Sequence, residues 1–404
     1  MPKISVFSSF FPPEIGAASS RIYDMCQGLH AAGYDVEVIT AMPNYPTGKT
    51  HPDYRGKFFS KEEMHGVTVR RHWIFPSHSD KAIFRLLNML SIALSVFFSF
   101  LHMLRKKPDV VIVQYPPVLL PLSAYLVSKI TGAKFIVNVS DLWPGAIHQL
   151  GKIKKGWSYR LLLKLEKTLY QSADYCMAQS QEIADYIGKR CQTPCFIYRT
   201  GAKCDTFEPK SNYEVEDRPL KIIYAGVLGL AHGILKVCKK IDFKALGTEF
   251  HIYGDGFEKQ KLLEFVEKNP DRGVFIHDSV PIPEIPELLG KYDAALISQK
   301  TKVFGTVPSK TYDAMAAGLP IMFNGCGEGS LIIKNTEAGL VSRPDSPKEL
   351  KRNILKMQKY SAEKREKMGV NGRQAALDMF DRKDQIQKLL QVMKVLCPEE
   401  KVLA

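Results

Sequence analysis

The sequence predicts an α/β chain built from two doubly wound, Rossmann-like domains. Short apolar runs alternate with helical segments along most of the chain, which is the pattern of β-α-β units with parallel strands. The 404 residues exceed the length at which a single hydrophobic core stops growing. We therefore expect an N-terminal domain over 1–203, a C-terminal domain over 204–375, and a last helical segment, 376–404, that packs back on the N-terminal domain.

The first domain opens with a β-α-β unit. Ile4–Ser8 is a buried strand, and the helix after it has Ile22, Met25, Cys26 and Leu29 on one face. Gly33 ends that helix, and Val36–Thr40 is the next strand. Further strands are expected at 109–113, 134–138 and 175–178.

A second series of strands follows a polar, proline-containing stretch near 199–220. Its strands are expected at 221–224, 250–253, 274–276, 294–297 and 320–323. Doubly wound sheets bind ligands beyond the carboxyl ends of their strands. We expect the two domains to face a central cleft that holds the ligand.

Composition narrows the choice of partners. The 56 basic and 42 acidic residues give a net charge of +14, which favours nucleotides, diphosphates or an anionic membrane surface. No nucleic-acid-binding motif is evident, so nucleic acid is not expected as a partner. Eight scattered cysteines without a secretory signal indicate a reducing cytoplasm. They form no paired zinc knuckle, so we expect neither a metal nor a cofactor.

The segment Leu86–Leu104 is apolar and about as long as a membrane span. Asn88 and His102 interrupt it, and the sheet pattern resumes directly after it. A span would put parts of one sheet on opposite sides of a membrane. We expect instead either a core helix or a helix that dips into a membrane face. Basic residues flank the segment on both sides: Lys81, Arg85, Arg105, Lys106 and Lys107.

The segment 305–321 reads as a loop, a helix and the start of a strand. Pro308 or Ser309 is expected to open the helix, with the serine as its cap, and Gly318 to close it. Ser309 and Asp313 share one helical face, and Lys310 lies beside Asp313. A hydroxyl, an ammonium and free N–H groups suit a phosphate, and Asp313 suits sugar hydroxyls. An ordinary capped helix is the plainer interpretation.

Two loops of the first domain carry candidate residues. Gly16 lies between a strand and a helix start, where a glycine lets a phosphate approach the backbone. Asp141 follows a strand and could orient a hydroxyl or support charge at a sugar carbon. A plain turn glycine and a locally paired aspartate are the alternatives.

Two loops of the second domain also carry candidate residues. Gly226, Gly229 and His232 lie in a glycine-spaced loop after the first strand, where His232 could donate to a diphosphate. Tyr253 and Gly254 form a strand-end turn that could lie under a nucleotide. A surface histidine and an ordinary turn would give the same pattern.

Taken together, these segments resemble the family-4 glycosyltransferases of GT-B fold, and most of all the bacterial group that builds O-antigen and capsule, including L-fucosamine-type transferases. The resemblance runs nearly from end to end. Its motifs are PPEIGAASSR, GYDVEVITAMPNYPTG, HGVTVRR, PDVVIVQYPP, VNVSDLWP, YAGVLG, YGDG and VPSKTYDAMAAGLPI.

The resemblance implies roles for the candidate residues. It places Asp141, Lys310 and Asp313 in the active site, with Asp313 at the second glutamate of the family's glutamate motif, which holds the ribose. It places the other donor contacts at Gly16, Gly226, Gly229, His232, Tyr253, Gly254, Ser309 and Tyr312. Two departures stand out: Gly305 replaces the first glutamate of the motif, and the basic residue common after the YAG strand is missing.

The implied activity is retaining hexosyl transfer, without a metal or cofactor, from a nucleotide sugar. The donor would be UDP-linked and could be an N-acetylated amino or deoxy sugar. The acceptor would be a sugar on polyprenyl diphosphate at the inner face of the cell membrane, to which the cytoplasmic protein would bind peripherally. A nucleotide-sugar 2-epimerase of the same architecture and a non-catalytic accessory subunit are the alternatives.

Overall fold

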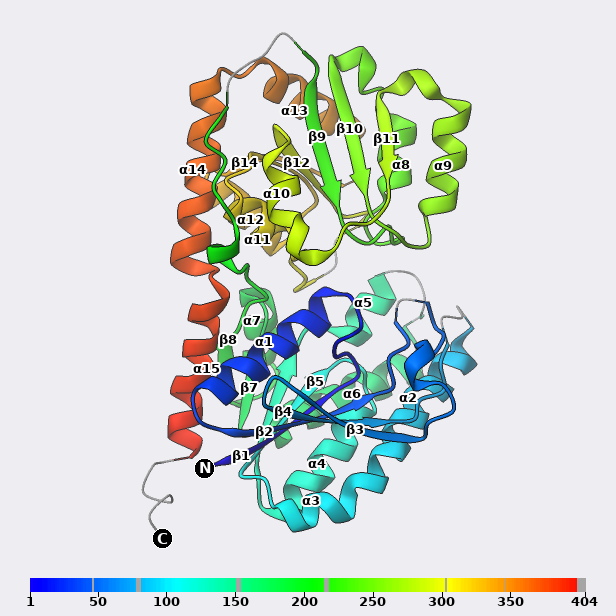
Figure 1. Cartoon of the computed structure of the whole chain (residues 1–404), viewed down its shortest axis with the longest axis vertical. Coiled ribbons are helices and arrows are strands. Elements are labelled where there is room, and N and C mark those ends of the chain that lie inside the picture. Colours follow the sequence, from blue (N-terminus) through cyan, green and yellow to red (C-terminus); the bar gives the residue numbers. More distant parts are fainter. Residues whose placement is uncertain are drawn as a thin grey trace. The chain divides into compact units, whose positions relative to one another are not determined.

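The computed structural model (Figure 1) divides the chain into two compact units. Unit 1 is Met1–His148, Ile153–Arg199 and Gln385–Ala404, and unit 2 is Gln149–Lys152 and Thr200–Asp384. The structure describes residues 1–45, 47–77, 81–149, 153, 155–213, 218–301, 304–344 and 346–397.

Unit 1 contains an eight-stranded sheet in the order β3-β4-β2-β1-β5-β6-β7-β8. All neighbouring strands pair in parallel except the antiparallel hairpin of β3 and β4. The strands are β1 Lys3–Ser8, β2 Asp35–Ala41, β3 Phe59–Met64, β4 Val67–His72, β5 Val110–Tyr115, β6 Lys134–Val139, β7 Tyr175–Ala178 and β8 Cys195–Ile197.

Helices cover both faces of this sheet. Alternate strand residues supply two buried apolar clusters, one packed with α1 and α15 and the other with α2, α4, α6 and α7. The helices are α1 Ala17–Ala31, α2 Ala82–Ser95, α3 Phe100–Lys106, α4 Leu120–Thr131, α5 Trp143–Gln149, α6 Trp157–Ser172, α7 Gln181–Gly188 and α15 Arg382–Leu396, with 3₁₀ turns at Pro52–Tyr54 and Val96–Ser99.

The last helix completes the core of the N-terminal unit. Leu389 and Met393 of α15 are fully buried in one cluster with Ile22 and Met25 of α1. The helices meet so closely that a Cβ atom at Gly28 would lie 2.5 Å from the Ile386 side chain. A glycine in α1 thus makes room for the end of the chain.

Unit 2 contains a six-stranded sheet in which every pairing is parallel, in the order β11-β10-β9-β12-β13-β14. The strands are β9 Leu220–Ala225, β10 Thr248–Tyr253, β11 Val274–His277, β12 Ala294–Ser298, β13 Ile321–Asn324 and β14 Gly339–Ser342. The helices are α8 Ile234–Lys240, α9 Lys259–Lys268, α10 Ile285–Gly290, α11 Lys310–Ala316, α12 Glu328–Asn335, α13 Pro347–Lys359 and α14 Ala362–Met379, with 3₁₀ turns at Cys204–Thr206, Lys244–Leu246, Pro270–Arg272 and Ile282–Glu284.

The predicted fold class is confirmed, and each predicted strand overlaps an observed one. The strands missed are the hairpin β3–β4 and the short strands β8 and β14. β3, with the sequence FSKEEM, is partly solvent-exposed along its whole length, so it lacks the apolar run that marks a buried parallel strand.

The apolar segment Leu86–Leu104 is not the single helix expected. It forms most of α2, the 3₁₀ turn Val96–Ser99 and the start of α3. In the part of the chain that the structure describes, no single helix is long and apolar enough to cross a membrane. Ile83–Ser95 and Phe100–Lys106 together have that length and composition, but they are bent by 44°.

Candidate functional site

Helix α11 carries three of the predicted site residues, and its end forms as the sequence predicts. Gly318 has a φ of +66°, a backbone conformation that favours glycine. Its N–H donates to the Met315 carbonyl at 3.0 Å, and the N–H of Leu319 donates to the Ala314 carbonyl at 3.0 Å. This pair of bonds is a Schellman motif, which satisfies the last carbonyls of the helix.

The predicted serine cap at the other end is wrong. Ser309 already has helical angles, φ −57° and ψ −34°, and its hydroxyl makes no capping hydrogen bond. Instead, the N–H of Thr311 donates to the Pro308 carbonyl at 2.9 Å, and that of Tyr312 to the Ser309 carbonyl at 2.9 Å. The serine hydroxyl is therefore not used to cap the helix.

The centre of the site is the side chain of Lys310, at the start of α11. Its Nζ donates to the hydroxyl of Tyr224 at 2.7 Å and lies 4.0 Å from the centre of that ring. Tyr224 is buried at the end of β9, and its own hydroxyl donates to the Val227 carbonyl at 2.7 Å. One ammonium group thus joins the end of β9, the loop after it and α11.

Two of the predicted glycines are needed for this arrangement. Gly226 has a φ of +138°, and a Cβ atom there would lie 2.9 Å from the Lys310 Nζ. Gly254 has a φ of +151°, and its Cβ atom would lie 2.0 Å from the Gly226 carbonyl oxygen. The N–H of Gly226 also donates to the Tyr253 carbonyl at 2.9 Å. The two strand-end turns are therefore packed backbone to backbone.

The charged groups of α11 have strongly shifted pKa values. Burial lowers the pKa of Lys310 to about 7, against an opposing effect of Asp313. Burial raises the pKa of Asp313 to about 6, although Arg382 and Lys310 act in the other direction. Among the described residues, the Asp313 carboxylate accepts no hydrogen bond, and its side chain keeps some exposure to solvent. An acid with no fixed partner beside a partly desolvated cation can bind a ligand that carries both hydroxyls and negative charge.

His232 lies beside this group as a neutral side chain. Its ring is 6.1 Å from that of Tyr224, and its Nδ1 lies 3.4 Å from the Ser298 carbonyl oxygen. Burial and the nearby Lys310 lower the pKa of His232 to about 3. The N–H of His232 donates to the Gly229 carbonyl at 3.0 Å, which closes the glycine loop. At neutral pH the imidazole can take part in hydrogen bonds but adds no charge.

Two predicted tyrosines lie elsewhere. Tyr312 is 1% exposed and packs against Phe380, with ring centres 5.1 Å apart, so its side chain belongs to the core. Tyr253 stacks on His277, with ring centres 4.2 Å apart, and its hydroxyl lies 2.8 Å from that of Tyr292. In the case of Tyr253, the backbone rather than the ring meets the glycine loop.

Gly16 and Asp141 belong to unit 1. The backbone at Gly16 is extended, with φ 163°, and a Cβ atom there would make an ordinary 3.5 Å contact with Tyr45. The conformation therefore does not require glycine at this position. The loop is held by Glu14, whose carboxylate accepts the N–H groups of Asn44 at 2.7 Å and Tyr45 at 2.9 Å.

Asp141 lies beyond the carboxyl end of β6, as predicted. Its neighbour Ser140 accepts hydrogen bonds at 2.9 Å from Arg21 of α1 and at 2.9 Å from Gln179. Arg21 is a buried cation at 3% exposure that the sequence analysis did not single out. A basic residue near the start of a helix that follows a glycine loop was the available signal.

The second residue missed is Arg382, whose guanidinium donates to the carbonyls of Thr200 and Gly201 at 3.0 Å each and acts electrostatically on Asp313. Gly305, in place of the motif glutamate, has a φ of +80°. Side chains rarely adopt that conformation. The missing carboxylate thus coincides with a turn that favours glycine.

Two protein-family models match the chain in tandem. A model described as "Glycosyl transferase 4-like domain" matches residues 16–190, and one described as "Glycosyl transferases group 1" matches residues 205–375. The chain belongs to the family-4 glycosyltransferases of GT-B fold. Both halves of this glycosyltransferase are thus accounted for, including the segments that hold Gly16, Asp141 and Lys310.

Individual proteins agree with this family. The glycosyltransferase is 25% identical over 332 residues to the "Putative colanic acid biosynthesis glycosyl transferase WcaI" of Escherichia coli (strain K12), covering 78% of this chain and 81% of that protein. In fold it resembles the sucrose-phosphate synthase of Thermosynechococcus elongatus, with TM-score 0.78, 14% identity, and coverage of 98% and 99% of the two chains. It also resembles HepE of Anabaena in complex with UDP, with TM-score 0.70, 12% identity, and coverage of 98% and 100%.

Proposed function

We propose that this glycosyltransferase moves a sugar from a UDP-linked donor to a lipid-linked sugar acceptor during synthesis of a bacterial surface polysaccharide such as capsule or O-antigen. The observation that carries the proposal is the placement of Lys310. Its ammonium lies against the Gly226 turn at the end of β9, and Asp313 follows one helical turn later. A nucleoside diphosphate is bound by a cation and an approachable backbone at its phosphates and by a hydrogen-bond acceptor at its ribose hydroxyls. Lys310, the Gly226 turn and Asp313 offer these three groups.

Lys310 would stabilise the leaving group. Cleavage of the bond between sugar and diphosphate leaves extra negative charge on the nucleotide, and a desolvated cation beside it lowers the barrier. The low pKa of Lys310, about 7 without a ligand, would rise when the diphosphate binds, because a nearby anion favours the ammonium form. Helix α11 has only 7 residues, so the side chain rather than the helix dipole would supply most of the charge.

Asp313 would bind the ribose of the nucleotide. A carboxylate that accepts no hydrogen bond from the described residues is available for the two ribose hydroxyls. Arg382 behind it favours the ionised form. Gly226, Gly229, Gly254, His232 and Ser309 would line the diphosphate, mainly through the backbone.

Unit 1 would contribute the acceptor side. Asp141, beyond β6, would orient the attacking hydroxyl, and the backbone at Gly16 would approach the diphosphate. Arg21, held by Ser140 next to Asp141, would keep that edge of the sheet positively charged. Transfer of a hexosyl group with retention of configuration is part of the proposal, as is an acceptor on polyprenyl diphosphate. The cytoplasmic protein would therefore bind the anionic inner face of the cell membrane.

The names of similar proteins support this proposal. WcaI is named for colanic acid biosynthesis, and HepE was solved with UDP. The decisive experiment is a melting-temperature screen with nucleotide sugars, followed by turnover with a lipid-linked sugar. Stabilisation by a UDP-sugar and formation of a longer lipid-linked glycan are expected, because a ligand stabilises the state that binds it. Epimer formation without an acceptor would instead identify a 2-epimerase, and donor-independent support of another transferase would identify an accessory subunit.

A further inference from the structure

Helices α2, α3 and α4 of unit 1 carry large apolar side chains on their outer side as well as on the side that packs into the core. On α2, five large residues are between 37% and 61% exposed, and they follow one helical stripe: Ile83, Leu86, Leu87, Leu90 and Leu94. On α4, Leu122, Leu126 and Ile130 form a second stripe, each at least 39% exposed. Leu101 of α3 is 69% exposed. We call these nine residues the apolar face.

Uncharged polar residues of α2 and α4 form hydrogen bonds on the inner side of these helices. Asn88 donates to the Phe75 carbonyl at 2.7 Å, and Ser95 donates to the Trp73 carbonyl at 2.7 Å. Ser123 of α4 donates to the Ala93 carbonyl of α2 at 2.9 Å, so the two helices are joined next to Leu94 and Leu122. A surface helix in water normally has the opposite arrangement, with its polar side outward. Helices that are apolar on the outer side as well as in the core indicate an apolar environment outside.

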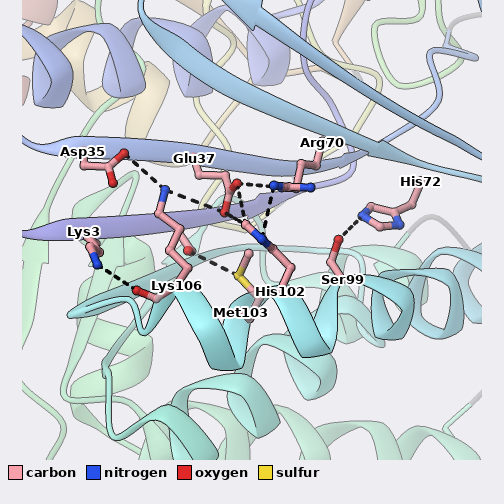
Figure 2. A network of polar contacts seen from close by, with 10 residues as sticks. Lys3, Asp35, Glu37, Arg70, His72, Ser99, His102, Met103 and Lys106 are labelled. Carbon is pink, nitrogen blue, oxygen red and sulfur yellow. Dashed lines mark hydrogen bonds and ion pairs between the residues drawn. The ribbon is translucent and has the colours of Figure 1, made fainter.

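Helix α3 is fixed to the sheet by an ionic network (Figure 2). Glu37 of β2, 1% exposed, pairs with Arg70 at 2.7 Å and with His102 of α3 at 3.0 Å. Lys106 of α3 pairs with Asp35 at 3.2 Å. Moving α2 and α3 into a membrane as a span would take His102 and Lys106 away from Glu37 and leave this buried carboxylate with Arg70 alone, and breaking up a buried ionic network is costly. The segment is therefore held on the protein surface.

The charged residues around the apolar face indicate which kind of partner it can bind. None of α2, α3 and α4 contains an aspartate or glutamate. Arg105, Lys107 and Lys129 are exposed near the ends of α3 and α4. A second copy of this chain would bring the same positive charges together across the contact. An anionic lipid surface matches both the apolar residues and the basic ones.

We propose that the α2–α4 apolar face lies flat on an anionic membrane, with its leucines in the interfacial layer and its basic residues at the headgroups. This inference rests on the proposed function in one respect, the lipid tail of the acceptor. It places the membrane contact on three packed helices, including α4. It also implies that these helices lie on the membrane surface and do not span the bilayer. The contact would hold unit 1 at the depth where lipid-linked sugars are found.

The test is flotation of the full chain with vesicles of phosphatidylcholine, with and without phosphatidylglycerol. Two variants change each stripe separately: Leu86→Glu with Leu94→Glu on α2, and Leu126→Glu with Ile130→Glu on α4. Each is expected to weaken binding to the anionic vesicles by about 100-fold, through lost apolar burial and added repulsion. The matched control, Leu263→Glu with Val370→Glu, changes comparably exposed residues of α9 and α14 and should lose less than about tenfold.

Three results would overturn the proposal: an α4 variant that binds like the unchanged chain, equal binding to neutral vesicles, or a dimer in solution that the apolar-face variants abolish. Melting temperature with and without a UDP-sugar is measured on every variant. A variant that keeps its donor-induced stabilisation and loses vesicle binding supports the docking face. If a UDP-sugar does not raise the melting temperature of the unchanged chain, the proposed function is contradicted. The vesicle-binding results still decide the docking proposal, because they do not depend on the donor.

Discussion

The chain buries charge in two places, and the two differ in how that charge is compensated. In unit 1, Glu37 has Arg70 and His102 within 3.0 Å and Lys106 at 3.8 Å (Figure 2). In unit 2, Lys310 has one neutral partner, Tyr224, and Asp313 has no hydrogen bond from the described residues. A compensated charge holds elements together, whereas an uncompensated one has its pKa shifted and is ready for a ligand. Burial alone does not distinguish structural from functional charge.

The largest effect is expected at the compensated site. Glu37→Gln leaves Arg70, Lys106 and His102 around a neutral amide, and it should lower the free energy of unfolding of unit 1 by about 3–5 kcal/mol. Lys134→Gln, which breaks the exposed ion pair with Asp174, is the control and should cost at most about 1 kcal/mol. Urea unfolding monitored for each unit measures both. A small loss in the Glu37 variant would mean that the network is not a structural one.

At Asp313, in the uncompensated site, we expect a loss of donor affinity without a loss of stability. Asp313→Ala should weaken binding of a UDP-sugar by about 1.5–3 kcal/mol, because charge-assisted bonds to the ribose are lost. Its stability should not fall, since burial disfavours the ionised carboxylate more than Arg382 and Lys310 favour it, and no described group donates a hydrogen bond to it. Calorimetric titration and thermal unfolding test the two halves of this prediction. The control, Asp378→Ala, removes an exposed carboxylate of α14 whose one hydrogen bond among the described residues comes from Gln374, one helical turn away. Unchanged donor affinity in the Asp313 variant would refute the role assigned to it.

The shifted pKa values predict how donor affinity depends on pH. Below the pKa of Asp313, about 6, its carboxylate is protonated and accepts hydrogen bonds poorly. Above the pKa of Lys310, about 7, the free protein must take up a proton to bind the diphosphate, so affinity falls as pH rises. The dissociation constant should therefore be lowest between these values. The diphosphate of a UDP-sugar does not titrate in this range.

Two variants separate the limbs of that profile. Lys310→Arg should flatten the alkaline limb, because a guanidinium keeps its proton. Asp313→Asn should flatten the acid limb. An unchanged alkaline limb in the arginine variant would assign that limb to another group.

A smaller effect is expected from the hydroxyl that holds Lys310. Tyr224→Phe keeps the ring under the ammonium but removes the hydrogen-bond acceptor, which should weaken donor binding by about 1 kcal/mol. Tyr213→Phe is a close control, because its hydroxyl also donates to a carbonyl at 2.7 Å, that of Gly318 at the other end of α11. Equal donor affinities for the two variants would show that Tyr224 does not position Lys310.

No effect is expected from metal removal. The described residues contain no group of three or more His, Cys, Asp or Glu side chains that could hold a metal ion. Lys310 offers positive charge for the diphosphate instead. Turnover should be the same with EDTA as with added Mg²⁺ or Mn²⁺. Activity that disappears with the chelator and returns with either ion would contradict this prediction.

Local patterns made much of this molecule predictable. Apolar runs gave the buried parallel strands, and the spacing of Lys310 and Asp313 within one helix gave their proximity. Partners far apart in the sequence were not predictable in this way. Lys310 meets Tyr224 across 86 positions, and His102 meets Glu37 across 65. The pairing of such groups depends on strand order, which the sequence pattern does not encode residue by residue.

Ser309 and Leu86–Leu104 show where local patterns mislead. A serine before a helix usually caps it, but here the chain enters the helix one residue earlier, so the cap is lost. The apolar segment has the composition of a span, but two of its polar residues, Asn88 and His102, bond to Phe75 and Glu37 and fold it back on the sheet. In both cases, residues outside the local pattern decide which structure the segment forms.

The burial of Leu389 and Met393 against Ile22 and Met25 has a consequence for the order of folding during synthesis. The strands of unit 1 leave the ribosome first, but the part of one sheet face that α15 covers stays exposed until this helix, which begins almost half the chain after β8, has emerged. Unit 2 has all its strands before then. We expect the second half of the protein to reach its native state before the first, and a nascent chain arrested before Gln385 to present an apolar surface to chaperones.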